Sequence, residues 1–533
     1  MAGFSNFSLD PYEGVWTTRE ASHLLRRTMY SPSKDDIADA AAEGLDNIVS
    51  RLLQGNPLPD LPINFYYDED PFTSIGESWV NKPMPRADNT NQIRRARVRS
   101  ISAWTMGLAL EEGVSIREKM TLFWHNHFVT GDERDPNFIY KNITLYRQNF
   151  LGNFRELTKQ TTIDPSMLRY LNGNQNTRFK PNENYARELL ELFTIGKGPT
   201  VGEGDYTNYT EHDVAEIAKV LTGWRDKGYL YRVGGELPGS FFTTWRHDTT
   251  TKKLSHRFGE IEIPNMGEQE YSHLIDIIFE QEEVSRFIAR KIYRWFVYYD
   301  IDDVIEKNVI YPMSEILREN DYEMYPMVEA LLKSQHFYDS YAIGSLIKNP
   351  LDFLVGTVKQ LEIDLGTDMR RKYQLWLRIG NLSELLQMSY FTPPNVAGWK
   401  AYYQEPLYYR TWINSTTLSL RFQLTNLLIN GVEAEDIRIG ADVLGMIEKI
   451  EGADDPIVLI DQLAALVLPE EITDDQKSYL KSILLPGLPD YEWTVEYNEY
   501  LANPNNRELK TAVENRLRGM IAGMMSLPEY QLS

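Results

Sequence analysis

The sequence predicts a mainly α protein: a large multi-helical domain with a small β-rich insertion near residues 226–262. Three observations support this fold class. Apolar side chains recur at helical spacing, for example at Ile101, Trp104 and Leu108. Several of these segments open with a hydroxyl residue followed three positions later by an acidic one, the pattern of a capping box. Glycine closes many of them, as expected where a helix ends.

These signals place the helix starts in chain order. Three segments carry a capping box: Thr17-x-x-Glu20, Ser115-x-x-Glu118 and Thr210-x-x-Asp213. Asp164 before Pro165 predicts an N-cap followed by proline at the first helical position. A further helix is predicted over 182–195, ended by Gly196. Residues 55–90 contain six prolines, so we expect this stretch to wrap the surface without a helix.

The segment 226–262 departs from the helical pattern. Residues 229–233 lead into Gly234-Gly235, which is a hairpin turn signal, and Phe241, Phe242 and Trp245 follow. We expect the notable β content of the chain to lie here. Helical periodicity then resumes near residue 268. The predicted organisation is a helical core domain over 1–430 and a C-terminal helical layer over 431–533 packed on it, with one continuous domain as the alternative.

Composition excludes several classes of protein. The 533 residues contain 77 Asp and Glu against 55 Lys and Arg, a formal charge of -22, so the chain is acidic and we expect no nucleic-acid partner. There is no cysteine, which excludes disulfides, thiolate metal sites and a cysteine nucleophile. The sequence also lacks a phosphate-binding glycine loop, a dinucleotide fingerprint, a nucleophile elbow and a His-Glu-x-x-His motif.

Hydropathy predicts a soluble protein. No run of 18 apolar residues occurs, so no membrane span is expected. The N-terminal residues have neither a basic start nor an apolar stretch of signal-peptide length. A cytoplasmic location is therefore expected for the sequence as written, and an exported or periplasmic one if a signal peptide has been removed.

The first candidate for chemistry is Trp124-His125-Asn126-His127-Phe128. Two histidines two positions apart share a face on a strand, where they can chelate one metal, but on a helix they point about 200° apart. Only a distorted helix end brings His125 and His127 to one ion. The alternatives are a shared functional site and two buried histidines bonded to backbone or carboxylate groups.

The second candidate lies in the helix predicted over 182–195. Glu188 and Glu191 share one face with Asn184, and Glu183 and Arg187 form a neighbouring i, i+4 pair. In one interpretation this is an exposed face with a modest ion pair. In the other, the helix is buried nearly all round, and Glu188 then needs Arg187, a histidine or a metal beside it.

The third candidate is His247-Asp248 in the β-rich insertion, where a general base or a metal ligand would lie on a loop. Neighbouring His and Asp residues also occur by chance. A last feature is the aromatic loop 391–399, which is followed by Trp412. Trp399 and Trp412 either stack on a sugar ring or anchor this proline-rich turn to the helices.

Several of these motifs, taken together, resemble one family. The segments are His23–Arg27, Arg117–Phe128, Asp164–Leu168, Asn182–Phe193, Glu211–Val214, Leu221–Trp224, His247-Asp248, Ile347–Pro350, Pro393–Trp399 and Ser526–Tyr530. In this order they are similar to the bacterial family with a domain of unknown function 1800. The resemblance implies a helical fold, a bacterial origin and often a sulfatase-like protein encoded nearby. Many members are exported, and the family supplies no established reaction.

Two functions remain open at this point. The first is an enzyme, a metal-assisted hydrolase acting on a saccharide or cell-envelope component, with a divalent metal as candidate cofactor. One polar cleft would then be lined by His125, His127, Glu183, Arg187, Glu188, His247 and Asp248. The alternative is a non-catalytic helical scaffold or binding protein, in which the same groups form a satisfied buried network. A small-molecule or saccharide ligand fits either function.

Overall fold

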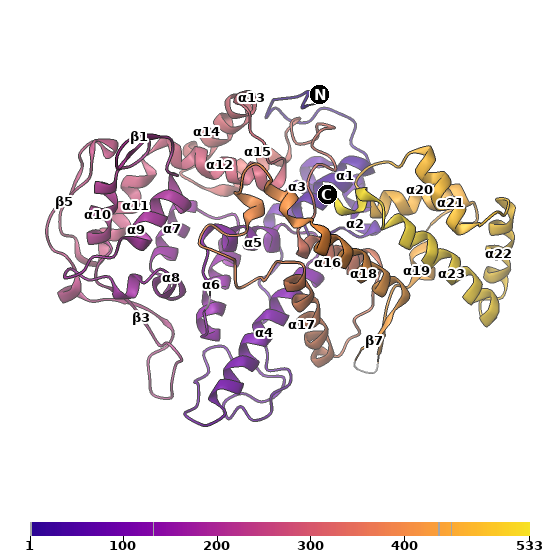
Figure 1. The fold of residues 1–533 in the computed structure, drawn as a ribbon, viewed down its shortest axis with the longest axis horizontal. Coiled ribbons are helices and arrows are strands. Elements are labelled where there is room, and N and C mark those ends of the chain that lie inside the picture. The colour runs from indigo at the N-terminus through magenta and orange to yellow at the C-terminus, as the bar shows by residue number, and fades with distance from the viewer. Residues whose placement is uncertain (1–2, 132, 435–436, 449) are drawn as a thin grey trace.

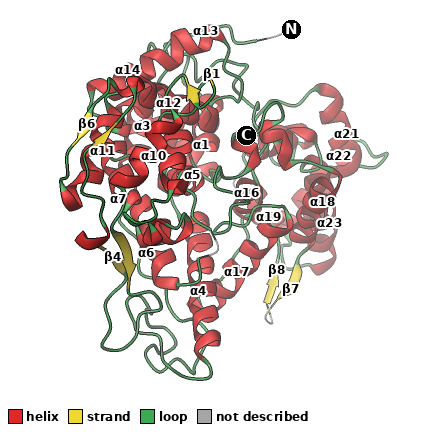
Figure 2. Cartoon of the chain, turned by 60° about the vertical axis from the view of Figure 1, so that its left-hand side comes forward, coloured by secondary structure: helices red, strands yellow, loops and turns green. Residues whose placement is uncertain are grey.

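Helices make up most of the computed structural model, which describes residues 3–131, 133–434, 437–448 and 450–533 (Figure 2). The helices before the β-rich insertion are α1 (Thr18–Thr28), α2 (Lys34–Glu43), α3 (Leu45–Gln54), α4 (Thr90–Glu111), α5 (Arg117–His127), α6 (Pro136–Gln148), α7 (Phe154–Thr162), α8 (Pro165–Tyr170), α9 (Glu183–Glu188) and α10 (Glu211–Val220). Those after it are α11 (Glu270–Phe279), α12 (Glu282–Phe296), α13 (Asp303–Ile305), α14 (Tyr311–Glu319), α15 (Met324–Leu332), α16 (Pro350–Gln360), α17 (Met369–Leu385) and α18 (Ser415–Asn430). The C-terminal segment contains α19 (Val443–Glu448), α20 (Pro456–Val467), α21 (Asp474–Leu484), α22 (Tyr491–Ala502) and α23 (Arg507–Met524). The mainly α fold class is confirmed, and none of the described helices is both long and apolar enough to cross a membrane.

Most of the helix starts expected from the sequence are formed. Capping boxes open α1 and α10, and Asp164 caps α8 ahead of a proline. The capping box predicted at Ser115 is wrong, because α5 begins at Arg117 and has no side-chain cap. The carboxylate of Glu118 instead accepts two hydrogen bonds from the buried Arg147, at 2.6 and 2.9 Å. A charge-assisted, bidentate pair is stronger than a bond to a main-chain amide, so it determines where Glu118 points.

The described strands form four two-stranded antiparallel sheets. Two of them lie in the predicted insertion: β3 (Trp224–Lys227) with β4 (Gly239–Phe242), and β5 (Lys252–Lys253) with β6 (Glu262–Ile263). Two further short hairpins lie outside the predicted insertion and were not expected: β1 (Thr200–Gly202) with β2 (Asp205–Tyr206), and β7 (Val432–Ala434) with β8 (Ile437–Ile439). Gly204, at a φ of +67°, makes the tight turn between β1 and β2 possible.

Segments distant in sequence meet in the middle of the molecule. Figure 1 shows α7–α11 on the left and α19–α23 on the right, with α5, α6 and α16 between them. A cluster of buried apolar side chains runs from Ala21 in α1 to Tyr530 near the C-terminal end, and α18 packs on α23. The division of the chain at residue 430 stays a prediction.

The aromatic loop 391–399 docks on α5 through a close backbone approach. The main-chain N–H of Trp399 donates to Oδ1 of Asn126 at 3.0 Å. Gly398 has a φ of +88°, and a Cβ at this position would lie 2.2 Å from the same Asn126 oxygen. Only glycine fits this contact without displacing α5 or the loop. The contact places the loop beside His125 and His127 on the central helix.

Candidate functional site

The two histidines of α5 are buried and bind main-chain carbonyls in different parts of the protein. Nε2 of His125 donates to the carbonyl of Tyr390 at 2.7 Å, and Nε2 of His127 donates to the carbonyl of Phe193 at 3.0 Å. Burial lowers the pKa of His125 to about 4 and that of His127 well below 6.5, so both rings are neutral at pH 7. Each ring therefore fixes α5 to another segment: His125 to the loop that contains Tyr390, and His127 to the stretch that contains Phe193.

Lys291 of α12 completes the surroundings of His127. Its ammonium group donates to Nδ1 of His127 at 3.1 Å and to the carbonyl of Leu192 at 2.9 Å. Burial lowers the pKa of Lys291 to about 7. The accepting carbonyls of Leu192 and Phe193 belong to a π-helical stretch, Leu189–Thr194, that continues α9. The side chains of α5 and α12 thus bind main-chain carbonyls of this wider turn.

The acidic cluster of the 182–195 helix is less buried than expected. Glu183 is exposed and Glu188 is half-buried, so of the two interpretations the one with burial nearly all round is wrong. Arg187 forms a bidentate pair with Glu211, with both bonds at 2.7 Å, and a longer contact of 3.4 Å to Glu183. Burial and then the carboxylate of Glu191 raise the pKa of Glu188. The main partner of the Arg187 guanidinium is therefore Glu211 at the start of α10.

His247 belongs to a separate, fully buried cluster in the insertion. Its Nδ1 lies 3.0 Å from the carbonyl of Thr222, and its Nε2 lies 3.1 Å from Oε2 of Glu270. The other oxygen of Glu270 pairs with Lys252, and both of these side chains are 0% exposed. Lys252 also donates to the main-chain carbonyl of Asp248. The side chain of Asp248 accepts from the N–H of Thr250 at 2.9 Å and shapes the loop.

The three sequence-predicted clusters are joined only in part. His127 meets the 182–195 helix through a main-chain carbonyl. Among the described residues, the hydrogen bonds of His247 and Asp248 instead go to the insertion, to Thr222 and to Glu270 of α11. Within the described part of the chain, no group of three or more His, Asp or Glu is placed to hold a metal ion. The shared polar cleft stays a prediction.

A different set of residues converges on a small cavity at the centre of the molecule, which we call the arginine pocket. Its volume is about 40 Å³, enough for a few water molecules or the acidic group of a ligand. It is lined by Arg26, Arg27, Lys119, Arg294, Trp295, Tyr299, Leu346, Ile347, Asn349, Asp352, Ala401, Tyr402, Tyr408, Tyr409, Trp412 and Ser533. Arg26 and Arg27, Lys119, and Ile347 with Asn349 come from three of the motifs that carry the family resemblance. Segments more than 300 residues apart therefore build one site.

Cationic side chains outnumber carboxylates in the arginine pocket. Arg26, Arg27, Lys119 and Arg294 line it together with one acidic side chain, Asp352. Lys119 forms an ion pair with Asp352, which also accepts from Nδ2 of Asn349 at 2.8 Å. Only one of the four cations thus has a carboxylate partner within the pocket lining. The local charge is opposite to the net charge of the chain.

Arg27 is the least satisfied of these cations. Its side chain is 3% exposed, and its Nη2 donates to the carbonyl of Ala342 and to Oγ of Ser345. Nε and Nη1 have no hydrogen-bond partner among the described residues. Burial lowers the pKa of Arg27 to about 9, which reflects the cost of holding a cation there. An anion in the pocket would remove that cost.

Aromatic rings form the remaining wall of the arginine pocket. The ring of Tyr402 lies between Trp295 and Trp412, with centroid distances of 4.4 and 6.0 Å. Trp399 is outside the lining and is buried against His125, as the anchoring interpretation of the loop expects. Trp412 does line the pocket, where it is in a position to contact a ligand.

The histidine and carboxylate motifs of the chain did not indicate the arginine pocket. One signal was available: Arg26 and Arg27 directly follow Leu24 and Leu25 in α1, where every residue from Glu20 to Thr28 is buried. Two adjacent arginines on such a helix cannot both point to solvent. Arginines within a segment predicted to be buried all round would have indicated an internal cation site.

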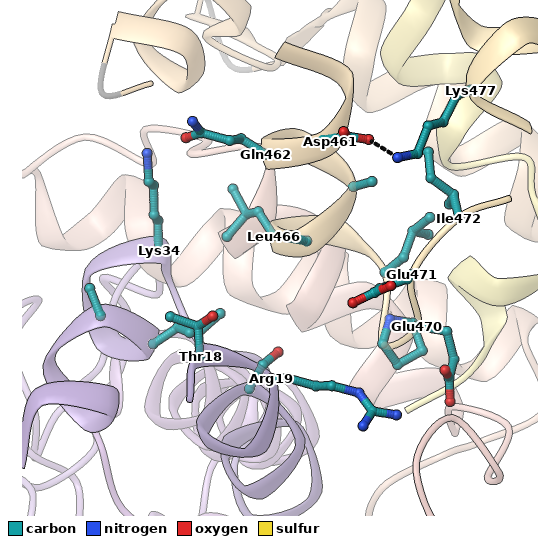
Figure 3. A pocket seen from close by; sticks show the side chains of 17 residues that line it. Thr18, Arg19, Lys34, Asp461, Gln462, Leu466, Glu470, Glu471, Ile472 and Lys477 are labelled. Carbon is teal, nitrogen blue, oxygen red and sulfur yellow. Dashed lines mark ion pairs between the residues drawn. The ribbon is translucent and has the colours of Figure 1, made fainter. Parts of the chain in front are cut away.

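A larger groove of about 570 Å³ lies between α1–α2 and α20–α21. Figure 3 shows Thr18 and Arg19 on one side of it and Asp461 and Gln462 on the other, with Asp461 paired to Lys477 at 2.8 Å. Its charged side chains balance, with Arg19, Lys34 and Lys477 against Asp461, Glu470 and Glu471. This groove therefore has no charge preference for a ligand.

Comparison with known proteins agrees with the resemblance inferred from the motifs. No curated protein and no solved structure matches the chain. A family model described as "Protein of unknown function (DUF1800)" matches residues 23–532. This span contains the arginine pocket apart from Ser533, and it runs through the helical core, the insertion and the C-terminal helices. The chain belongs to the DUF1800 family.

Proposed function

We propose that the arginine pocket is the ligand site of this protein and that it binds the acidic group of a small molecule: a carboxylate, a sulfate or a phosphate. The observation that supports this most directly is Arg27, whose guanidinium is buried with two N–H-bearing nitrogens unpaired. A buried cation without an anionic partner is costly. Guanidinium groups bind carboxylate and phosphate oxygens through charge-assisted hydrogen bonds, so an anion oxygen beside Nε or Nη1 of Arg27 would supply a missing acceptor and compensate the buried charge.

The walls of the pocket indicate how the rest of the ligand would lie. At about 40 Å³ the cavity accommodates an acidic group but not a whole metabolite. Arg294, Trp295, Tyr299, Tyr402 and Tyr409 are partly exposed, so they mark the side that is open to solvent. An organic ligand would insert its acidic group between the buried arginines and place its body against these aromatic rings.

The hydrolase predicted from the sequence would take its substrate in this pocket. An acidic saccharide or cell-envelope component fits the combination of cations and aromatic rings. Asp352 is the one lining carboxylate, and Lys119 and Asn349 orient it, so it would be the proton acceptor in place of the predicted histidines. The second candidate function is a non-catalytic scaffold, which is favoured by the main-chain partners of His125 and His127.

Anion binding can be measured directly on the full chain. We would titrate sodium phosphate, sodium sulfate and sodium acetate into the protein at constant ionic strength, and record calorimetric heats and the melting temperature. A ligand at 100 times its Kd stabilises the folded state by about 2.7 kcal/mol. We expect at least one of the three anions to bind and to raise the melting temperature.

Variants separate pocket binding from general salt effects. Arg27→Met and, as a more exposed second variant, Arg294→Met are expected to lose the binding heat. Arg51→Met is the matched control, since Arg51 lies on α3 in a surface pair with Glu43 at 2.5 Å and does not line the pocket. The proposal fails if no anion binds, or if Arg27→Met and Arg294→Met both bind the anion as well as Arg51→Met does. The scaffold alternative would then be preferred.

A further inference from the structure

A third cavity, of about 550 Å³, lies between α6, the junction of α7 and α8, and the β-rich insertion. Its lining consists of Asn81, Asn137, Tyr140, Lys141, Thr144, Leu145, Gln148, Gln160, Ile163, Asp164, Pro165, Leu237, Pro238 and Ser240. None of these residues lines the arginine pocket. Its volume lies within the range of about 300–1,000 Å³ that is typical of small-molecule sites. We call this cavity the amide pocket.

One face of α6 forms the longest wall of the amide pocket. Asn137, Tyr140, Thr144 and Gln148 follow one another at three- and four-residue steps, which places them on the same side of the helix. Four lining residues, at positions 81, 137, 148 and 160, carry side-chain amides, and three more carry hydroxyl groups. Such groups both donate and accept hydrogen bonds. The wall is polar but uncharged along most of its length.

Two buried donors on this wall lack partners. Asn137 is 2% exposed, and its Oδ1 accepts from the N–H of Asn81 at 2.8 Å, which fixes the orientation of the amide. Nδ2 of Asn137 and Oγ1 of Thr144 have no hydrogen-bond partner among the residues that the structure describes. Buried polar atoms are nearly always satisfied in native proteins, so these two unsatisfied atoms, although closed off from solvent, are an unusual feature of this wall.

Charge in the amide pocket is limited to Lys141 and Asp164, one of each sign. Oδ1 of Asp164 is engaged at the start of α8, where it accepts from the N–H of Ser166 at 2.9 Å, and it also accepts from Asn142 at 3.1 Å. Lys141 is exposed to solvent. The pocket therefore favours neither an anion nor a cation, in contrast to the arginine pocket.

We infer that the amide pocket binds a neutral saccharide. Sugar hydroxyls are donors and acceptors at once, and amide and hydroxyl side chains match them in both directions. Leu237 and Pro238 add an apolar surface beside these groups, and the C–H face of a sugar ring can pack on such a surface. Leu237 is 54% exposed, so this apolar edge is reachable from solvent. The site is independent of the proposed anion site.

The test uses the full chain with three probes: maltohexaose, cellohexaose and chitohexaose, each titrated by isothermal calorimetry. Gln148→Ala and Gln160→Ala alter exposed wall residues, so both variants should fold normally. Gln175→Ala is the matched control, because Gln175 is an exposed glutamine outside the lining. We expect at least one hexasaccharide to bind, about five- to tenfold more weakly to each wall variant, as for the loss of one hydrogen bond, and unchanged to Gln175→Ala.

The outcomes distinguish this inference from the proposed function. Arg27→Met should bind the hexasaccharide like the unmodified chain, and sodium phosphate should not compete with it. The inference is overturned if none of the three probes binds, or if both wall variants bind as tightly as the control. Competition by phosphate together with loss of binding in Arg27→Met would assign the sugar to the arginine pocket and would likewise overturn it.

Discussion

The buried Lys252–Glu270–His247 cluster allows a sharp test of whether His247 has a structural role. Replacing Lys252 by methionine keeps the length of the side chain and removes its charge. The carboxylate of Glu270, 0% exposed, would lose its charged partner and keep His247 and the main-chain N–H of Met266. Removing one partner of a buried ion pair costs about 3–5 kcal/mol, because the other charge stays buried and uncompensated. We therefore expect Lys252→Met to destabilise the protein strongly.

The expected shift in melting temperature follows from the size of the chain. Unfolding entropy is about 2.1 cal/mol/K per residue. For 533 residues this gives about 1.1 kcal/mol/K for unfolding of the whole chain, so 3–5 kcal/mol corresponds to about 3–5 °C. Differential scanning calorimetry at pH 7 resolves such a shift. The double variant Lys252→Met with Glu270→Gln should recover part of it, since the uncompensated charge is then gone.

The next residue provides a matched control. Lys253 pairs with Glu260 at 3.1 Å, and these side chains are 52% and 64% exposed. Exposed pairs contribute little, so Lys253→Met should shift the melting temperature by less than about 1 °C. Equal shifts in Lys252→Met and Lys253→Met would refute the reasoning. Glu270 would then tolerate burial without Lys252, and His247 would be free for another role.

Three further predictions concern the central helices. Burial and the nearby Glu118 raise the pKa of Glu112 to about 8, above its ordinary 4.5, so stability should fall as pH rises from about 4.5 to 8. Glu112→Gln should therefore raise the melting temperature at pH 8.5 but not at pH 5, and equal effects at both values would contradict this. Burial lowers the pKa of His125 to about 4, whereas the same histidine in the unfolded chain has the ordinary value of 6.5. As pH falls from 6.5 to 4, the unfolded chain is therefore protonated before the folded protein, and stability is lost. His125→Gln should flatten that part of a melting-temperature profile, and an unchanged slope would show that His125 is not buried. Gly398→Ala should lower the melting temperature by several degrees, because its Cβ would lie 2.2 Å from Oδ1 and 2.8 Å from the main-chain oxygen of Asn126, at a φ of +88° that alanine rarely adopts. Pairing it with Asn126→Ala removes only the side-chain contact and should relieve only part of the loss; an unchanged melting temperature in Gly398→Ala would contradict this close approach.

Much of the local structure followed from the sequence because its causes are local. Thr17 with Glu20 and Thr210 with Asp213 form their capping boxes from residues three positions apart. The box at Ser115 failed because Glu118 had a stronger partner, Arg147, 29 residues away. A local rule holds only where no distant charge competes with it.

The short hairpins illustrate the same limit. A hairpin was expected around Gly234-Gly235, and β3–β4 forms there, but residues 229–233 lie in the connection between the two strands and not in a strand; β1–β2 and β7–β8 were not expected. They are only two or three residues long, so alternation of side chains gives almost no signal. Contacts with the surrounding helices stabilise such short strands, and a sequence pattern does not report these contacts.

The sequence by itself determined the helical fold class, the family and the residue types available for chemistry. Helix formation depends on spacing, caps and stops within one or two turns, all of which are written along the chain. Only the tertiary structure decided which charges meet. Arg27, Lys119 and Asp352 lie 92 and 233 residues apart along the chain, yet they line one pocket because α1, α5 and α16 pack together. Their burial, and the excess of cations that results, arises from that packing, which is why the arginine pocket was found in the structure and not in the sequence.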